Sequence, residues 1–223
     1  MIEGLVESDA RVTLLGASAF DPEAFRTCLA LAPVLVAADG AARQAVSVGH
    51  IPDAVIGDFD SLDPGTLAQI PTERLHRIDE QDTTDFDKAL RSISAPLTLA
   101  VGFTGQRLDH ELAVYNALVR LSGRPCIVVG SDDICFHAPP RLTLDLAART
   151  RVSLFPMARV TGHSTGLKWP IAGLTFDPAG RIGTSNAAEG PVTLSFSGPG
   201  MLVILPRPAL EAAVRGLQAA TAG

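Results

Sequence analysis

The 223-residue chain has few cysteines, no long apolar run and few basic residues, and each of these features argues against a class of protein. Its three cysteines (Cys28, Cys126 and Cys135) are odd in number, lie in apolar surroundings and show no CxxC spacing, which favours reduced core residues over disulfides or a metal site. No apolar run reaches the roughly 18 residues of a membrane span, and the N-terminus lacks the layout of a signal peptide. We therefore expect a cytoplasmic protein without a membrane partner.

Basic residues are also scarce. The chain has 18 Lys and Arg against 24 Asp and Glu, a net charge of -6, and its basic residues are scattered. This pattern gives no electrostatic footprint for nucleic acid, so we expect no nucleic-acid partner, and a polyanionic ligand would need a cation as intermediary. The chain also lacks a GxxxxGK[ST] loop and a GxGxxG after its first strand, so neither a P-loop nor a dinucleotide site is supported.

What the sequence does contain is a regular alternation of short apolar runs with segments of helical period, from Arg11 to Val129. Such alternation predicts an α/β domain with a mostly parallel sheet. The expected strands are Arg11–Gly16, Val34–Ala38, Ala54–Gly57, Arg74–Ile78, Leu97–Gly102 and Cys126–Gly130. The expected helices are Pro22–Leu31, Ala41–Val48, Pro64–Gln69, Thr84–Ile93 and Leu108–Leu121, the last with an apolar stripe through Leu108, Leu112, Tyr115, Leu118 and Val119.

Beyond about Pro139 the pattern changes to strands separated by Gly, Pro and Asn turns. This spacing predicts a small all-β antiparallel sandwich, followed by a helix from about Pro208 to Ala220. The expected strands are Arg141–Leu146, Arg151–Phe155, Leu174–Phe176, Val192–Ser197 and Met201–Leu205. We thus predict an α/β domain over residues 1–139 and a β-sandwich domain over residues 140–223.

Two aspartates end the buried strand in the sequence DAVIGDFDS. If this segment stays extended, Asp58 and Asp60 share a face while Phe59 turns towards the core. Two carboxylates 4 Å apart repel by about 4 kcal/mol at an effective dielectric of 20, a cost that a bound cation such as Mg²⁺ would remove. The alternative is that Asp58 begins a turn and Asp60 caps the next helix.

More acids gather nearby: residues 53–87 hold ten acidic residues and two basic ones. Asp39 follows one predicted strand, as Asp58 does the next. In open α/β sheets ligands bind outside the carboxyl ends of the strands, where these loops would meet.

The sequence QDTTDFDKAL opens a predicted helix with Gln81, Thr84, Asp85 and Lys88. Helix capping by Asp82 or Thr83 would explain one or two of the acids. A carboxylate for metal (Asp85), a lysine for phosphate (Lys88) and an amide for orientation (Gln81) would explain why these three residues occur together.

The loop GFTGQRLDH adds glycines and Arg107 for phosphate, with Asp109 and His110 at another helix start. The alternative interpretation is an N-cap and a surface histidine.

The motifs together resemble those of the thiamine pyrophosphokinase family. The matching segments are Asp39-Gly40, IGDFDS, QDTTDFDKAL, GQRLDH, TGLKWP and TSN, in that order between Val34 and Leu205. The resemblance implies an α/β nucleotide-binding domain and a C-terminal β-sandwich, in a homodimer with active sites between subunits. It also implies transfer of diphosphate from ATP to the hydroxyl of thiamine, with Mg²⁺, giving thiamine diphosphate and AMP.

Residue roles follow from the same resemblance. It implies Mg²⁺ ligands at Asp58, Asp60 and Asp85, and a catalytic role for Asp60, Asp85 and Asp109. It assigns nucleotide contacts to Asp39, Gln81, Thr84, Lys88 and Arg107, and thiamine contacts to Trp169, Ser185 and Asn186. Without the resemblance, Trp169 would be assigned to the core of the sandwich. In an extended segment Lys168 faces opposite Trp169, so we leave it out of the site.

Two alternatives remain. A related diphosphokinase acting on a hydroxymethylpterin would share the metal chemistry, although the TGLKWP and TSN segments favour thiamine. A non-catalytic module that binds a nucleotide or thiamine would not need so costly a carboxylate cluster.

Overall fold

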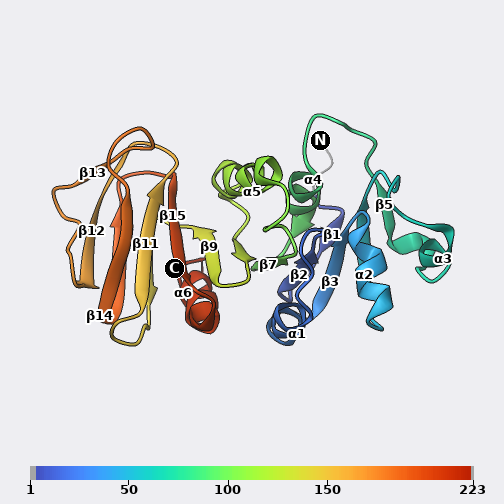
Figure 1. Cartoon of the computed structure of the whole chain (residues 1–223), viewed down its shortest axis with the longest axis horizontal. Coiled ribbons are helices and arrows are strands. Elements are labelled where there is room, and N and C mark those ends of the chain that lie inside the picture. Colours follow the sequence, from blue (N-terminus) through green and yellow to red (C-terminus); the bar gives the residue numbers. More distant parts are fainter. Residues whose placement is uncertain (1–3, 222–223) are drawn as a thin grey trace. The chain divides into compact units, whose positions relative to one another are not determined.

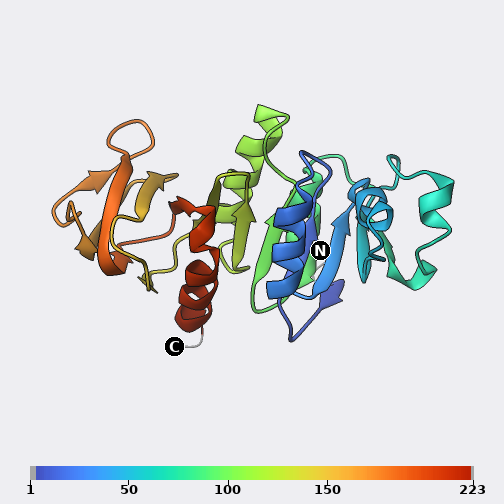
Figure 2. The same cartoon turned by 60° about the horizontal axis from the view of Figure 1, so that its bottom comes forward.

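The computed structural model describes residues 4–221 and divides them into two compact units (Figures 1 and 2). Unit 1 contains the residues up to Ala117 together with Val128–Gly130. Unit 2 contains Leu118–Ile127 and the residues from Ser131 onward. The functional boundary expected at residues 139–140 stays a prediction.

Unit 1 is built on parallel strands in the order β7-β2-β3-β4-β5 (Figure 1). The strands of this unit are β1 (Val6–Glu7), β2 (Val12–Leu15), β3 (Val34–Ala38), β4 (Ala54–Gly57), β5 (Leu75–Arg77), β6 (Ile93–Ser94) and β7 (Thr98–Val101), and β1 and β6 form a separate parallel pair. Its helices are α1 (Pro22–Leu31), α2 (Ala41–Ser47), α3 (Pro64–Leu67), the 3-10 turn η1 (Thr72–Arg74) and α4 (Asp85–Ser92). Two elements, α5 (Leu108–Arg120) and β8 (Cys126–Val129), contribute residues to both units. The mostly parallel α/β sheet expected from the sequence is therefore present.

The boundaries of the helices follow local chemistry. Asp21 accepts hydrogen bonds from the N–H groups of Glu23 (2.9 Å) and Ala24 (3.1 Å), and Pro22 suits the first turn of α1. Strands β2 and β4 are buried along their whole length, as expected for strands covered on both faces. The carboxyl ends of the parallel strands are thereby held in fixed register.

Unit 2 is β-rich, and its paired strands are antiparallel. They follow the order β13-β12-β14-β11-β15-β9, and β10 also pairs with β14. The elements are β9 (Asp133–His137), β10 (Arg141–Leu144), β11 (Arg151–Pro156), β12 (Val160–Leu167), β13 (Thr175–Phe176), β14 (Gly183–Phe196), β15 (Met201–Pro206), the 3-10 turn η2 (Arg207–Ala209) and α6 (Leu210–Thr221).

Two strands of unit 2, β9 and β12, were not predicted. β12 contains Gly162 and Gly166, and glycine lowers strand propensity, which hid the strand in the sequence. Gly162 is needed because a Cβ there would lie 2.7 Å from the Ser195 carbonyl oxygen. β14 begins at Gly183 rather than Val192, pairing first with β11 and then with β10 and β12.

The cysteines are confirmed as buried and free. Burial, with a further contribution from Asp133, raises the pKa of Cys135 to about 12, so this thiol stays protonated at neutral pH. Among the helices of residues 4–221, none has the length and apolarity needed to cross a bilayer.

Candidate active site

The first part of the candidate site lies where β3 and β4 end. These parallel strands pair with Ala38 opposite Ile56, so Asp39 and Gly57 leave the sheet side by side. A Cβ on Gly57 would lie 2.7 Å from the Asp39 Cβ, which explains why this position needs glycine. The close approach brings Asp39, which is buried, against the loop that carries Asp58 and Asp60.

That loop is a turn and not the extended segment expected from the sequence. β4 stops at Gly57, and Phe59 has a φ of 67°, in the left-handed region. The Phe59 N–H donates to Asp39 Oδ1 (2.9 Å), and the Asp60 N–H donates to Asp58 Oδ1 (3.2 Å). The two aspartates therefore approach each other by reversal of the chain. The turn that we considered as the alternative is present, but the residue that caps α3 is Asp63 and not Asp60.

Three carboxylates converge at this edge. Oxygen atoms of Asp39, Asp58 and Asp60 all lie within 4.8 Å of one another. Burial, together with the negative charges of these three groups, raises the pKa of Asp85, although half of its side chain is exposed and Lys88 opposes the shift. A set of carboxylate oxygens is the donor type that Mg²⁺ prefers, and a divalent cation would relieve their repulsion. The residues present therefore fit a Mg²⁺ ion.

Lys88 supplies a buried positive charge to the same cluster. Its side chain is 4% exposed, and Nζ lies 3.7 Å from Asp58 Oδ2 and 3.7 Å from Asp85 Oδ1. Gln81 Nε2 donates to Asp58 Oδ2 (3.2 Å). The Asp60 N–H, then Gln81 and the Lys88 charge lower the pKa of Asp58, which keeps this carboxylate ionised.

Thr84 has a structural role at the start of α4. It is the N-cap residue, and its hydroxyl accepts a hydrogen bond from the Asp87 N–H (3.4 Å). The cap lies one residue after Thr83 and two after Asp82, the capping residues that we considered. Capping fixes the first turn of the helix and so orients Asp85 and Lys88.

The loop before α5 presents an ion pair to solvent. Arg107 donates to Asp109 through Nη2 (2.6 Å) and Nε (3.2 Å), and both side chains are 65% exposed. The hydrogen bonds from Arg107 lower the pKa of Asp109, which makes this carboxylate a weak base. The Gly105 N–H is a candidate hydrogen-bond donor to phosphate, but here it donates a hydrogen bond to Glu111 Oε2 (3.0 Å).

The residues predicted to contact thiamine lie in unit 2. Trp169 and Asn186 exchange two hydrogen bonds: the Trp169 N–H donates to Asn186 Oδ1 (3.1 Å), and Asn186 Nδ2 donates to the Trp169 carbonyl (2.7 Å). Both line a cavity of about 200 Å³, and the Trp169 side chain is exposed rather than part of the core. Ser185 precedes Asn186 with a φ of 62°, and its N–H donates to Ser153 Oγ (3.0 Å).

Lys168 departs from the expectation that it faces away from Trp169. Its Nζ lies over the indole ring, 4.6 Å from the ring centroid, in a cation–π arrangement. The chain leaves β12 at Leu167, so the alternation of an extended strand no longer separates the two side chains. Lys168 is thus part of the surroundings of Trp169.

Sequence reasoning missed two features of these sites. Asp39 was assigned to the nucleotide only, whereas its carboxylate lies with Asp58 and Asp60; its position directly after a buried strand was the available signal. Arg181 and Ile182 line the cavity beside Trp169, and no motif marks them.

A comparison with protein families finds a match over part of the chain. Residues 25–129 match the model described as "Thiamin pyrophosphokinase, catalytic domain". This segment contains the carboxylate cluster, Lys88 and the Arg107–Asp109 pair. The resemblance inferred from the short motifs is confirmed.

Curated relatives carry the same description. The chain is 27% identical over 163 residues to thiamine pyrophosphokinase 1 of Oryza sativa subsp. japonica, covering 65% of this chain and 62% of the relative. It is 27% identical over 157 residues to thiamine pyrophosphokinase 1 of Arabidopsis thaliana, covering 62% and 59%. The matches thus span about three fifths of the length of these relatives.

Solved structures show that the fold extends over most of the chain. The crystal structure of thiamin pyrophosphokinase from Geobacillus thermodenitrificans matches with a TM-score of 0.70 at 23% identity, covering 88% of this chain and 96% of that one. Yeast thiamin pyrophosphokinase matches with a TM-score of 0.73 at 18% identity, covering 90% and 87%.

Proposed function

We propose that this chain, whose residues 25–129 match the thiamin pyrophosphokinase catalytic domain, transfers diphosphate from ATP to the hydroxyl of thiamine, giving thiamine diphosphate and AMP. The observation that carries the proposal is the convergence of Asp39, Asp58 and Asp60 at one sheet edge, beside Asp85 and the buried Lys88. An acidic protein needs such an arrangement of cation-binding groups to hold a polyphosphate.

We assign the metal side to Asp58, Asp60 and Asp85, with Asp39 as a further carboxylate. Bound Mg²⁺ would supply neutralisation of the negative charge on the phosphates. Lys88 helps to keep Asp58 ionised, lies beside Asp85 and presents the ammonium for a phosphate oxygen, and Gln81 orients Asp58. Thr84 positions this group by capping α4.

Asp109 and Arg107 serve the reacting groups in this proposal. We assign Asp109 to orienting the thiamine hydroxyl more than to deprotonating it. In a loose phosphoryl transfer the hydroxyl proton leaves late, so orientation supplies most of the effect. Arg107 would exchange its exposed pairing with Asp109 for a phosphate oxygen.

Trp169, Ser185 and Asn186 form the acceptor side of the proposal. An indole face attracts a cationic aromatic ring by about 0.5–2 kcal/mol. The two hydrogen bonds between Trp169 and Asn186 fix the backbone that carries the indole. The proposed division is then a nucleotide- and metal-binding domain over residues 1–139 and a β-sandwich thiamine-side domain over residues 140–223. We further propose a cytoplasmic homodimer with active sites between subunits.

An AMP-release assay with ATP, Mg²⁺ and thiamine tests the function. We expect AMP formation that depends on thiamine, and a loss of about 100-fold or more in kcat/KM for Asp60→Asn, because a charge-stabilising group is removed. The matched control is Asp9→Asn, which removes one exposed carboxylate of unit 1 outside the cluster and should keep the activity.

The other outcomes separate the alternatives. AMP release with a hydroxymethylpterin but not with thiamine would show that the pterin, and not thiamine, is the acceptor substrate. Binding of Mg²⁺–ATP and thiamine without AMP release, unchanged in Asp85→Asn, would indicate a binding module.

A further inference from the structure

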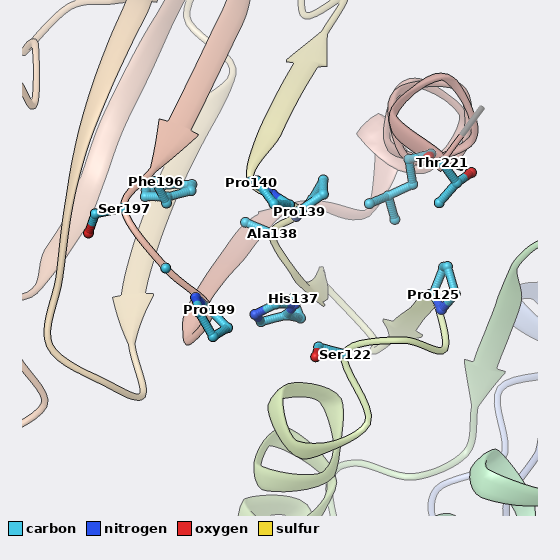
Figure 3. Close-up of a pocket in the computed structure, with 12 residues that line it drawn as sticks. Ser122, Pro125, His137, Ala138, Pro139, Pro140, Phe196, Ser197, Pro199 and Thr221 are labelled. Carbon is cyan, nitrogen blue, oxygen red and sulfur yellow. Dashed lines mark hydrogen bonds between the residues drawn. The ribbon is translucent and has the colours of Figure 1, made fainter. Parts of the chain in front are cut away.

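Unit 2 contains a second cavity, of about 310 Å³, which shares no lining residue with the cavity beside Trp169 (Figure 3). Its walls come from the end of β9, the loop after β14, the last turns of α6 and the turn that follows α5. Among its lining residues there is no Asp, Glu, Lys or Arg. This volume is near the lower end of the range for ligand sites in proteins, so the cavity suits a small ligand.

Most of the wall is apolar and rigid. Four prolines line the cavity together with Phe196 and Leu217, and the proline rings lose no rotamer freedom when a ligand packs on them. The loops are tied together, because the Phe196 N–H donates to the Pro140 carbonyl (3.0 Å) and the Ala138 N–H donates to the Met201 carbonyl (2.8 Å). The cavity is therefore preformed, which lowers the entropic cost of binding.

His137 supplies the polar group. Figure 3 shows its imidazole between Pro199 and Ser122. Nε2 accepts a hydrogen bond from the Gly200 N–H (3.0 Å), so it carries no proton. Burial lowers the pKa of His137, and the neutral ring then carries its proton on Nδ1.

The Nδ1–H group is the important one for binding. Within residues 4–221, no group of the protein is hydrogen-bonded to it. A half-buried donor without a partner gains more from a ligand acceptor than a solvated donor would.

We propose that this cavity is a binding site for a small, neutral, planar aromatic compound with a carbonyl-type acceptor, which packs on the proline rings and accepts the His137 Nδ1–H. The lining has no full charge, so a charged ligand would lose its hydration without gaining an ion pair. This site is separate from the proposed diphosphate transfer and does not depend on it.

Three probes of similar shape test the proposal by calorimetry on the full chain. Acetophenone has the ring and the acceptor, cumene replaces the carbonyl oxygen by a methyl group, and benzoate adds a negative charge. We expect acetophenone to bind at one site, roughly 3- to 10-fold more tightly than cumene, as one neutral hydrogen bond predicts. Benzoate should bind more weakly than acetophenone. Equal affinities of acetophenone and cumene, or tighter binding of benzoate, would overturn the proposal.

Two variants place the binding in this cavity. Ser122→Phe adds a ring at an exposed lining position and should abolish acetophenone binding, whereas Ala148→Phe, at an exposed position of unit 2 outside the lining, should leave it unchanged. The ¹⁵N resonance of His137 Nδ1 should shift when acetophenone is added. Three results would each contradict the site. Acetophenone could still bind to Ser122→Phe, or the Nδ1 resonance could stay unmoved. The affinity could also fall as the protein concentration rises, because a second copy of the chain covers the cavity.

Discussion

At the scale of single residues, the carboxylate cluster depends on a missing side chain. Asp39 and the loop after β4 approach so closely that Gly57 has no room for a Cβ. Because protein interiors are close-packed, even one added methyl group at such a contact forces neighbouring atoms to move. The geometry of the proposed metal site is thus set partly by a residue that carries no functional group.

The first prediction concerns that glycine. In Gly57→Ala the new Cβ would lie 2.7 Å from the Asp39 Cβ, so Asp39 must move away from Asp58 and Asp60. We expect a loss of about 1–3 kcal/mol of unfolding free energy, as for other overpacked sites, and weaker binding of Mg²⁺–ATP. Urea unfolding and calorimetry measure the two effects. Gly123→Ala is the control, because nothing lies within 4 Å of a Cβ there; identical behaviour of both variants would contradict the prediction.

A second prediction concerns Lys168, whose ammonium covers the indole that we assign to thiamine. Thiamine is cationic, so Lys168 competes with it for the ring and repels it. In Lys168→Met we expect thiamine to bind about 2- to 5-fold more tightly, which corresponds to an exposed cation–π contact of about 0.5–1 kcal/mol. Because Trp169 is the single tryptophan of the chain, its fluorescence reports the binding directly.

Lys168→Arg is the matched control, since it keeps the positive charge. It should bind thiamine as the unaltered chain does. Weaker thiamine binding in Lys168→Met than in Lys168→Arg would show that the ammonium favours thiamine binding. It would contradict the proposed competition between Lys168 and thiamine for the indole ring.

At the scale of elements, helix α5 shows the limit of periodicity. The apolar stripe predicted a helix here, and the helix is present over Leu108–Arg120. However, Leu108 is 72% exposed and Leu112 is 57% exposed, whereas Leu118 is buried. Periodicity identifies which residues share a face, but what covers each turn of that face depends on the neighbouring elements.

The third prediction follows from this gradient along α5. Leu118→Ala should cost about 2–5 kcal/mol of unfolding free energy, because it leaves a cavity in the core. Leu112→Ala should change the stability of the isolated chain by less than about 0.5 kcal/mol, as for other surface substitutions. Urea unfolding of both variants at low protein concentration is the measurement. Equal losses in the two variants would mean that Leu112 is covered in solution.

At the scale of the whole molecule, ligand binding should stabilise the folded chain. We predict that Mg²⁺–ATP at 100 times its Kd adds about 2.7 kcal/mol, or roughly 5–10 °C in Tm for a chain of this size. The carboxylates repel one another without a cation, so ATP with EDTA should give a much smaller shift.

Thermal unfolding with Asp58→Asn completes this test. The variant should lose the Mg²⁺-dependent part of the shift, and Asp9→Asn should keep it. A shift of equal size with EDTA would mean that the nucleotide binds without a metal.

Much of the architecture could be predicted from the sequence, because helix caps and buried strands are encoded locally. Helix α1 and strands β3 and β4 have the predicted boundaries. Strand β12 was missed because its glycines are selected by contacts with Ser195 and Pro191 of β14, which lie far away in the sequence. Asp39 is likewise separated in the sequence from Asp58 and Asp60, by 19 and 21 residues.

The sequence by itself determined which groups are available: paired aspartates at a strand end, the QDTTDFDKAL helix start and a single tryptophan in the segment TGLKWP. These are local signals, since caps and strand ends depend on neighbouring residues. Only the tertiary structure decided how the groups meet. The parallel register of β3 and β4 brought Asp39 to the DFD turn, and the end of β12 turned Lys168 over Trp169. The physical reason is that packing sets the distances between segments far apart in the chain. Packing depends on all of these segments together, so no single segment contains the information needed to predict the distances.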